Sequence, residues 1–271
     1  MNISENLLDT RSGNGLFVAM DHGMGGVREG FENPAETLES VLKANPDGVL
    51  VGRNFAQKFD DKFAKSSNLK RVVTVDFKAT STLPGQSGDL EIQDLLFSLG
   101  DLADLNIDGI KTFLIFGREN PDVLKNNMKY LAKLALETRK YKVPLVVEPV
   151  MWGKKIDKKD KTDPELIENA CRIAFELGAD IIKAPYPGDR RTFEKIVKNT
   201  PVPVLILGGP QMDTRKDVFK TVHDSIKAGA RGIFFGRNIW QNDNPEGMIT
   251  SLRAIVHEKA SVEEALEILD V

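Results

Sequence analysis

Cysteine, histidine and aromatic residues are scarce in this chain of 271 residues, which holds one cysteine, three histidines and 7% aromatic residues. A single thiol, Cys171, excludes an internal disulfide framework and a cysteine-rich zinc site. Because Cys171 lies in an amphipathic helical run, we expect a buried structural thiol rather than a nucleophile. The scattered histidines show no metal-ligand spacing, so the sequence predicts no metal site.

Long apolar runs and an excess of positive charge are also missing. No segment approaches the roughly 18 apolar residues of a membrane span, and the first thirty residues lack a basic start followed by an apolar stretch. Lys plus Arg number 37 against 40 for Asp plus Glu, a formal net charge of −3. The balance argues against binding to nucleic acid or to an anionic membrane. We therefore expect a cytoplasmic protein that binds neither.

What the chain does contain is a repeated pattern of short apolar runs, each a candidate strand. These runs are too solidly apolar for half-solvated antiparallel strands, and their Val and Ile content suits parallel strands buried on both faces. Stretches of helical period separate most of them. The eight candidate strands span residues 16–21, 48–52, 71–77, 109–116, 144–150, 180–183, 204–207 and 232–235.

Helical periodicity predicts the elements between these strands. The predicted helices span residues 33–44, 90–105, 119–140, 163–178, 189–199, 214–229 and 244–258. Repeated strand-then-helix units predict a single α/β domain over residues 1–271, a (β/α)₈ TIM barrel at about 16–258 with an extra C-terminal helix at 261–270. A doubly wound open sheet is the competing topology. It normally carries G-x-G-x-x-G after its first strand, and DHGMGGV lacks that spacing.

Barrel enzymes carry their active residues at the carboxyl ends of the strands. That rule selects Lys183 in GADIIKAPY, because a structural lysine has little reason to end a buried strand. Burial disfavours the charged amine, and a neutral amine can attack a carbonyl to form a Schiff base. The alternative is a rim lysine that neutralises a carboxylate. The same rule also selects Asp21, His22, Arg53, Asp76, Lys78, Glu148, Trp152, Tyr186, Gly208, Gly209, Gly236 and Arg237.

Two glycine loops after the last strands point to a phosphorylated ligand. VLILGGP and GIFFGRN put Gly208, Gly209 and Gly236 where barrels often bind phosphate through backbone N–H groups, and Arg237 adds a charged donor. After the first strand, Asp21 either exchanges protons with a substrate hydroxyl or pairs with Lys183. His22 either contacts substrate or braces its loop.

Two loops are candidates for covering this site. The segment 154–161, KKIDKKDK, alternates lysine with aspartate and is more typical of a solvated excursion than of a phosphate clamp. The segment 76–89 follows the third strand and is rich in Ser, Thr and Gly. Because it lies on the catalytic face, we expect it to act as a lid.

Several motifs resemble the archaeal-type class I fructose-bisphosphate aldolases, within the deoxyribose-phosphate aldolase-like superfamily of barrels. The resemblance runs from about Val18 to Val256 and rests on MDHG (20–23), GADIIKAPYPGD (178–189), PVPVLILGGP (201–210) and AGARGIFFGRNIWQ (228–241). It implies a metal-independent and cofactor-independent aldolase of ketose phosphates, with Lys183 forming the imine, Asp21 beside it and the glycine loops holding phosphate. It also implies a homo-oligomer, typically a decamer.

One departure from that family changes the expected chemistry. Its Tyr-Pro-Arg-Gly motif after the fifth strand supplies a proton-transfer tyrosine and a phosphate-binding arginine, whereas PVMWGK puts Val150 and Trp152 there. Glu148 faces the same interior as Val150, because side chains alternate along a strand. Our hypothesis is that Glu148, or else Tyr186, takes over proton transfer. The alternative is that Glu148 only pairs with Lys183 or Lys78.

The same departure keeps other functions open. Replacing a flexible cation with the ring of Trp152 should weaken binding of a second phosphate and favour a less charged aldehyde half. A related branch, the coenzyme A-dependent thiolase of a phosphorylated dione, also lacks the motif and has a similar GRNIFQ-like segment. A sugar-phosphate binding protein that has lost catalysis is the third possibility.

Overall fold

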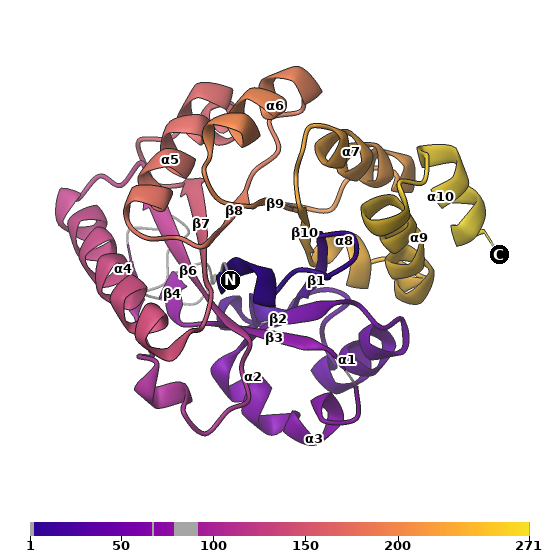
Figure 1. Cartoon of the computed structure of the whole chain (residues 1–271), viewed down its shortest axis with the longest axis horizontal. Coiled ribbons are helices and arrows are strands. Elements are labelled where there is room, and N and C mark those ends of the chain that lie inside the picture. Colours follow the sequence, from indigo (N-terminus) through magenta and orange to yellow (C-terminus); the bar gives the residue numbers. More distant parts are fainter. Residues whose placement is uncertain (1–2, 67, 79–91, 271) are drawn as a thin grey trace.

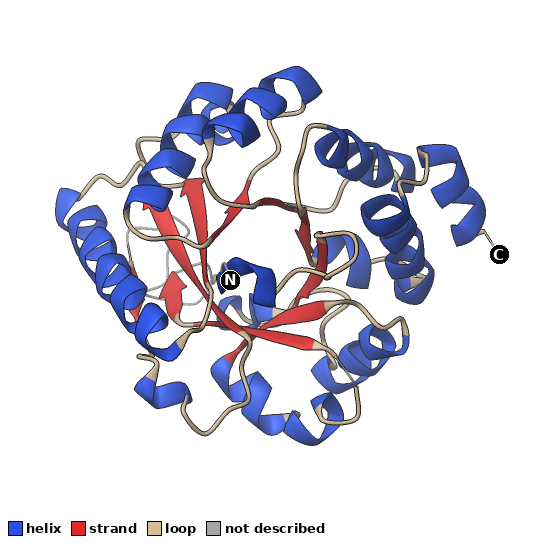
Figure 2. Cartoon of the chain, viewed as in Figure 1, coloured by secondary structure: helices blue, strands red, loops and turns tan. Residues whose placement is uncertain are grey.

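The computed structural model describes residues 3–66, 68–78 and 92–270. Eight parallel strands close into a barrel in the order β1-β2-β3-β6-β7-β8-β9-β10, and β10 pairs again with β1. Figure 2 shows this ring of strands surrounded by helices. The closed ring confirms the TIM barrel and excludes the open sheet. The barrel strands are β1 (Gly15–Ala19), β2 (Gly48–Gly52), β3 (Lys70–Thr74), β6 (Gly109–Phe116), β7 (Leu145–Met151), β8 (Ile181–Ala184), β9 (Val204–Leu207) and β10 (Gly232–Phe235).

The helices form the outer layer and begin at residues that suit helix starts. Asn33, Asn120 and Asp163 each cap a helix whose first residue is proline, so the side-chain oxygen accepts backbone N–H bonds at the helix start. The helices are α1 (Pro34–Lys43), α2 (Arg53–Lys58), α3 (Asp60–Phe63), α4 (Pro121–Tyr141), α5 (Pro164–Glu176), α6 (Arg190–Asn199), α7 (Arg215–Lys227), α8 (Arg237–Trp240), α9 (Pro245–Glu258) and α10 (Val262–Leu269). Figure 1 places α10, the predicted extra helix, outside the ring beside α9.

The predicted helix at 90–105 is wrong. The described part of that segment holds β5 (Gln93–Leu95), which pairs antiparallel with β4 (Asp76–Lys78), followed by the short 3₁₀ helix η3 (Gly100–Leu102). The backbone N–H groups of Leu96 and Phe97 both donate to the carbonyl of Val75. Pairing with a distant strand therefore overrides the local helical period. The third predicted strand, 71–77, is likewise split between β3 and β4.

One apolar layer fills the amino half of the barrel interior. The rings of Phe17 and Phe234 stack there with their centres 4.5 Å apart. Leu7 and Leu8, which follow the 3₁₀ helix η1 (Ile3–Asn6), join the layer from below. The chain therefore closes the amino end of its own barrel, and its N-terminus lies near the barrel axis in Figure 1. The other members of the layer are Ala19, Leu50, Val72, Val146, Ile181 and Leu205.

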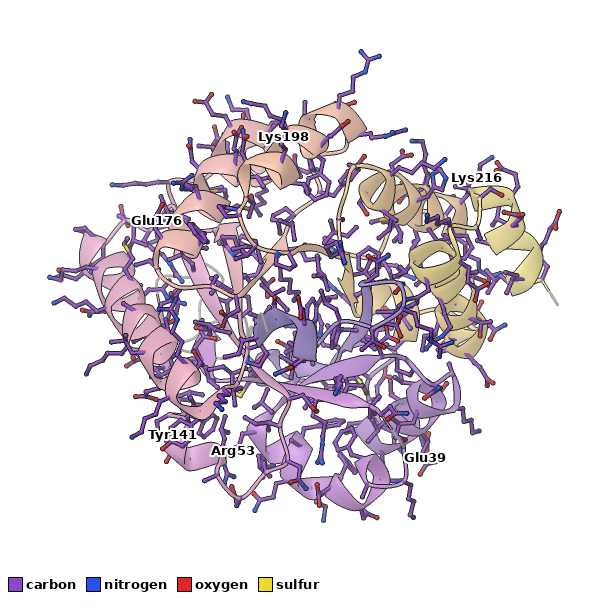
Figure 3. The ribbon with its side chains drawn as sticks, in the orientation of Figure 1. Glu39, Arg53, Tyr141, Glu176, Lys198 and Lys216 are labelled. Atoms are coloured by element: carbon purple, nitrogen blue, oxygen red, sulfur yellow. The ribbon has the colours of Figure 1, made fainter. Side chains whose placement is uncertain are left out.

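Charged side chains cover the outside of the helical layer. Glu176, Lys198 and Lys216, labelled in Figure 3, are exposed on α5, α6 and α7. The thiol of Cys171 is buried on α5, and burial raises its pKa to about 12. Within residues 3–66, 68–78 and 92–270, no helix combines the length and the apolar character that a membrane crossing requires.

Candidate active site

A cavity of about 280 Å³ opens at the carboxyl ends of the barrel strands. That volume is near the lower end of the range for small-molecule sites. Ten of the residues selected from the sequence line it, together with several that the sequence did not indicate. Its lining includes Asp21, His22, Arg28, Thr74, Asp76, Phe113, Glu148, Trp152, Lys183, Gly208, Gly209, Gly236 and Arg237.

Lys183 and Glu148 meet in the lining of the cavity. Lys183 lies on β8 and is 6% exposed, and Glu148 lies on the neighbouring strand β7. The Nζ of Lys183 donates to Oε2 of Glu148 across 2.9 Å. The lysine therefore points into the barrel as predicted, and it rests there in an ion pair with Glu148. The side chain of Lys78, the other predicted partner of Glu148, lies outside the described residues.

A second buried lysine, Lys111 on β6, completes a chain of charges that the sequence analysis missed. Its side chain is 0% exposed, and its Nζ lies 2.9 Å from Oε2 of Glu148 and 3.5 Å from Oδ2 of Asp21. The same nitrogen stands 2.9 Å from the centre of the Phe113 ring. Lys111 thus links the two carboxylates from below, and it does so without lining the cavity itself. A lysine inside the apolar run GIKTFLIF was the available signal.

Asp21 is held as a carboxylate by this arrangement. It begins the 3₁₀ helix η2 (Asp21–Gly25) after β1, and Thr74 Oγ1 donates to its Oδ2 across 2.7 Å. Burial by itself raises the pKa of Asp21. The positive charges of Lys111 and Lys183 outweigh the burial, so the pKa of Asp21 lies well below its ordinary value. Asp21 therefore pairs with Lys111 rather than directly with Lys183.

The loops after β9 and β10 form one end of the cavity, where two guanidinium groups gather. Gly209 has a φ of +65°, and a Cβ on Gly236 would lie 2.5 Å from the Ala19 carbonyl oxygen, so both positions require glycine. Burial, and then the nearby charge of Arg28, lower the pKa of Arg237. The buried Nε of Arg237 has no hydrogen-bond partner among the described side chains and backbone. A bound anion would offset the neighbouring positive charges of Arg28 and Arg237 and would accept a hydrogen bond from this Nε.

The opposite end of the cavity is largely aromatic. Trp152 and Phe113 line it with their ring centres 5.8 Å apart. Val150 is buried beneath them in a small apolar cluster with Phe113 and Ile115. Val150, at the position where the aldolases that the sequence resembles carry a tyrosine, therefore belongs to the core and cannot exchange a proton.

Some shortlisted residues lie away from the cavity. Tyr186 packs edge-on against Phe193, its hydroxyl finds no partner within the described chain, and burial raises its pKa to about 12. Arg53 donates to the carbonyl of Asp101 and pairs with the carboxylate of Asp104. Figure 3 labels Arg53 outside the ring of strands. Neither residue lines the cavity.

The two loops predicted to cover the site have different outcomes. The segment 154–161 is mostly exposed and contributes no residue to the cavity lining; it leads into the 3₁₀ helix η4 (Lys158–Thr162). That outcome agrees with a solvated excursion. The predicted lid at 76–89 lies, beyond β4, outside the described residues. Across the described ranges, no group of three or more His, Cys, Asp and Glu side chains could hold a metal ion.

Comparisons with known proteins by family, by sequence and by structure all find aldolases. A family model described as DeoC/LacD family aldolase matches residues 16–242. The class 1 fructose-bisphosphate aldolase of Thermoproteus tenax is 31% identical over 278 residues, covering 98% of this chain and 99% of the relative. An uncharacterised aldolase of Saccharolobus solfataricus is 29% identical over 259 residues, covering 95% and 94%. The fold matches that of a solved archaeal fructose-1,6-bisphosphate aldolase whose catalytic lysine is covalently bound to the carbinolamine intermediate, with a TM-score of 0.81, 29% identity, and 94% and 100% of the two chains covered.

Proposed function

Because this chain belongs to the DeoC/LacD aldolase family, we propose that it is a class I aldolase that cleaves or forms a carbon–carbon bond in a ketose phosphate through an imine on Lys183. One observation carries the proposal. The amine of Lys183 lies inside the cavity, 2.9 Å from a carboxylate, with the glycine loops and Arg237 lining the same cavity. A nucleophile, a proton acceptor and an anion site are the groups that this chemistry needs.

The first step is formation of the imine. Transfer of a proton from Lys183 to Glu148 frees the amine, which attacks the C2 carbonyl carbon of the ketose phosphate. The carbinolamine hydroxyl then takes a proton back from Glu148 and leaves as water. The resulting iminium withdraws electrons, so the C3–C4 bond breaks as the C4 hydroxyl gives its proton to the carboxylate of Glu148, leaving an aldehyde and an enamine on Lys183.

We assign the proton transfers to Glu148 rather than to Tyr186. Glu148 contacts Lys183 within the cavity, whereas Tyr186 packs against Phe193 outside the lining. A phenol whose pKa is raised to about 12 is also a poor base near neutral pH. Asp21, whose pKa is held low by the two lysines, stays ionised and balances the positive charge of the iminium.

The two ends of the cavity favour a ketose with one phosphate. The Arg237 and Arg28 end, with Gly208, Gly209 and Gly236, suits the phosphate of the ketone half. At the other end, Trp152 stands at the position where the archaeal-type aldolases that this chain resembles carry an arginine. We therefore expect cleavage of fructose 1-phosphate with a kcat/KM at least equal to that for fructose 1,6-bisphosphate. A strong preference for the bisphosphate in a coupled assay would contradict this expectation.

Borohydride trapping tests the imine. Incubation with dihydroxyacetone phosphate followed by reduction should add the mass of the reduced donor to the peptide that contains Lys183. Lys183→Arg should give no adduct, because a guanidinium does not form the imine, while Lys195→Met, which changes an exposed lysine on α6, should label fully. Binding of the phosphate without any adduct would instead favour a sugar-phosphate binding protein. Turnover that requires coenzyme A would favour the thiolase.

Two further properties belong to the same proposal. We propose that the protein forms a homo-oligomer, with a decamer as the first expectation from the resembled family, and that it acts in the cytoplasm on small sugar phosphates rather than on nucleic acid or membranes. Light scattering of the purified protein would give the number of subunits.

A further inference from the structure

Asp76 is a buried carboxyl that the steps above do not use. It lies at the start of β4, is 2% exposed, and lines the cavity. One of its oxygens, Oδ2, accepts hydrogen bonds from four donors. They are Thr112 Oγ1, Phe113 N and Tyr130 Oη, each at 2.9 Å, and Gln93 Nε2 at 3.2 Å. These bonds fix the carboxyl against β6 and α4.

The second oxygen of Asp76 is unsatisfied. Oδ1 is buried and has no hydrogen-bond partner among the backbone and side chains that the structure describes. A buried polar atom without a partner is rare and costly, so it calls for a ligand. Burial also raises the pKa of Asp76, against the opposing effect of Lys111 and of the hydrogen bonds, which favours a neutral carboxyl able to donate a hydrogen bond. Because Oδ2 is held toward β6 and α4, Oδ1 is the oxygen left for a molecule in the cavity.

The position of Asp76 in the barrel says which part of the substrate it meets. Asp76 lies two residues beyond the carboxyl end of β3. In the strand order, β3 is separated from β9 by β6, β7 and β8, so β3 and β9 face each other across the ring. The phosphate loops follow β9 and β10. A ketose bound by its phosphate there and by C2 at Lys183 extends its aldehyde half toward the wall that Asp76 shares with Phe77 and Phe113. The cavity's arginines, Arg28 and Arg237, belong to the loops of β1 and β10.

Resting on the proposed aldolase function, we propose that Asp76 hydrogen-bonds through Oδ1 to a hydroxyl group of the aldehyde half, so that the enzyme selects hydroxylated, uncharged aldehydes. Asp76 is then a specificity-determining residue. A site built to hydrogen-bond a substrate hydroxyl discriminates strongly against the analogue that lacks it, because the protein group is left unpaired.

The test compares acceptor aldehydes in the direction of bond formation. With dihydroxyacetone phosphate as donor, kcat/KM is measured for glycolaldehyde and acetaldehyde, and for glyceraldehyde and propanal. We expect the wild-type protein to favour the hydroxylated member of each pair by about tenfold or more. Asp76→Ala should bring each ratio to within about threefold of one. Asp94→Ala, which removes an exposed carboxylate from the neighbouring strand β5, should keep the wild-type ratios.

Asp76→Asn provides a second test in case the Asp76→Ala variant does not fold. The amide keeps the shape, offers its oxygen to the four donors and keeps a donor for the cavity, so the wild-type ratios should survive within about threefold. Ratios near one in the wild type or in Asp76→Asn, or wild-type ratios in Asp76→Ala, overturn the inference. If the wild type forms no trapped adduct with dihydroxyacetone phosphate, the proposed function fails. If the adduct forms but the kcat/KM ratios do not change when Asp76 is replaced by alanine, only this inference fails.

Discussion

At the scale of single residues, Lys111 decides the electrostatics of the site. It stands between Glu148 and Asp21, at 2.9 Å and 3.5 Å, and is completely buried. With Lys183, the four side chains alternate in charge and balance one another. Losing one member of a buried set costs more than the set contributes, because the remaining charges are left without compensation.

Lys111→Met should therefore damage both stability and catalysis. We expect a loss of about 3–5 kcal/mol in the free energy of unfolding near pH 7 and a fall in kcat of about 10²-fold or more. The pKa of Asp21 rises when Lys111 is removed. Because a depressed carboxyl pKa adds stability above the unfolded value of about 3.9, and that stability is lost as pH falls, the defect should shrink at acid pH. Urea denaturation from pH 7 to pH 3 measures it.

Lys133→Met, which changes an exposed lysine on α4, is the matched control and should shift neither quantity. A Lys111→Met defect that is constant across this pH range would contradict the coupling to Asp21.

The sequence could indicate Lys183, Asp21 and Glu148 because the strand-end rule and side-chain alternation are local. The strand-end rule does not select Lys111, which is the third residue of β6, although a lysine inside that apolar run is a signal. Nor does it select Thr74, whose bond to Asp21 joins β3 to the segment after β1. Asp76 was on the shortlist, but its pairing with Tyr130 and Gln93 depends on how α4 and β5 pack. Contacts between distant elements are not encoded in any one segment.

At the scale of elements, one side chain fixes the loop after β9, which we propose binds the substrate phosphate. Asn238, which lies on α8 and is 3% exposed, donates to the carbonyls of Gly208 and Pro210 at 2.9 Å and 3.1 Å. Its oxygen accepts from the N–H of Met212 at 2.8 Å. The helix that follows β10 thus holds the loop after β9. The position of one glycine turn relative to the other is therefore fixed.

Asn238→Ala should loosen the loop and weaken substrate binding. We expect KM for the ketose phosphate to rise about tenfold, or about 1.4 kcal/mol, because one buried carbonyl loses its donor. The effect on kcat should be smaller, since Lys183 and Glu148 lie on other strands. Steady-state kinetics measure both, and Asn199→Ala, at the exposed end of α6, should behave as wild type. A fall confined to kcat would refute this role.

Most elements follow from the sequence because their periodicity agrees with their burial. The exception at 90–105 shows the limit: Ile92, Leu95, Leu96 and Leu99 have a helical spacing, yet the segment pairs with β4 and with the carbonyl of Val75. Pairing across the chain cannot be inferred from a local pattern.

At the scale of the whole molecule, a hydrogen-bonded clamp joins the two ends of the barrel sequence. His257 at the end of α9 contacts Ser12 Oγ through Nδ1 and Asp47 Oδ2 through Nε2, both at 2.8 Å. Asp47 also accepts from the N–H of Leu16 at 2.6 Å. The clamp lies at the amino ends of β1 and β2, away from the cavity.

His257→Ala should lower the free energy of unfolding by about 2 kcal/mol, because Asp47 and Ser12 lose a partly buried partner. The kcat/KM should stay within about twofold of wild type, since the clamp and the cavity occupy opposite ends of the barrel. Urea denaturation and aldolase assays check the two parts. His223→Ala, whose ring contacts only the adjacent Asp224 among the interactions in the described chain, should lose much less stability. Equal losses in the two variants would disprove the clamp.

The layer beneath Lys183, sealed by Leu7, Leu8 and the stacked rings of Phe17 and Phe234, has a consequence for hydrolysis. The imine that we propose on Lys183 would have this apolar floor on one side in the described part of the chain. Water that leaves or attacks C2 would then pass through the open cavity, which is the space that the substrate occupies. Until the aldehyde departs, the ketose shields its own covalent link. Release of the aldehyde would therefore determine when water returns to the cavity. Only then could hydrolysis release the donor half from Lys183.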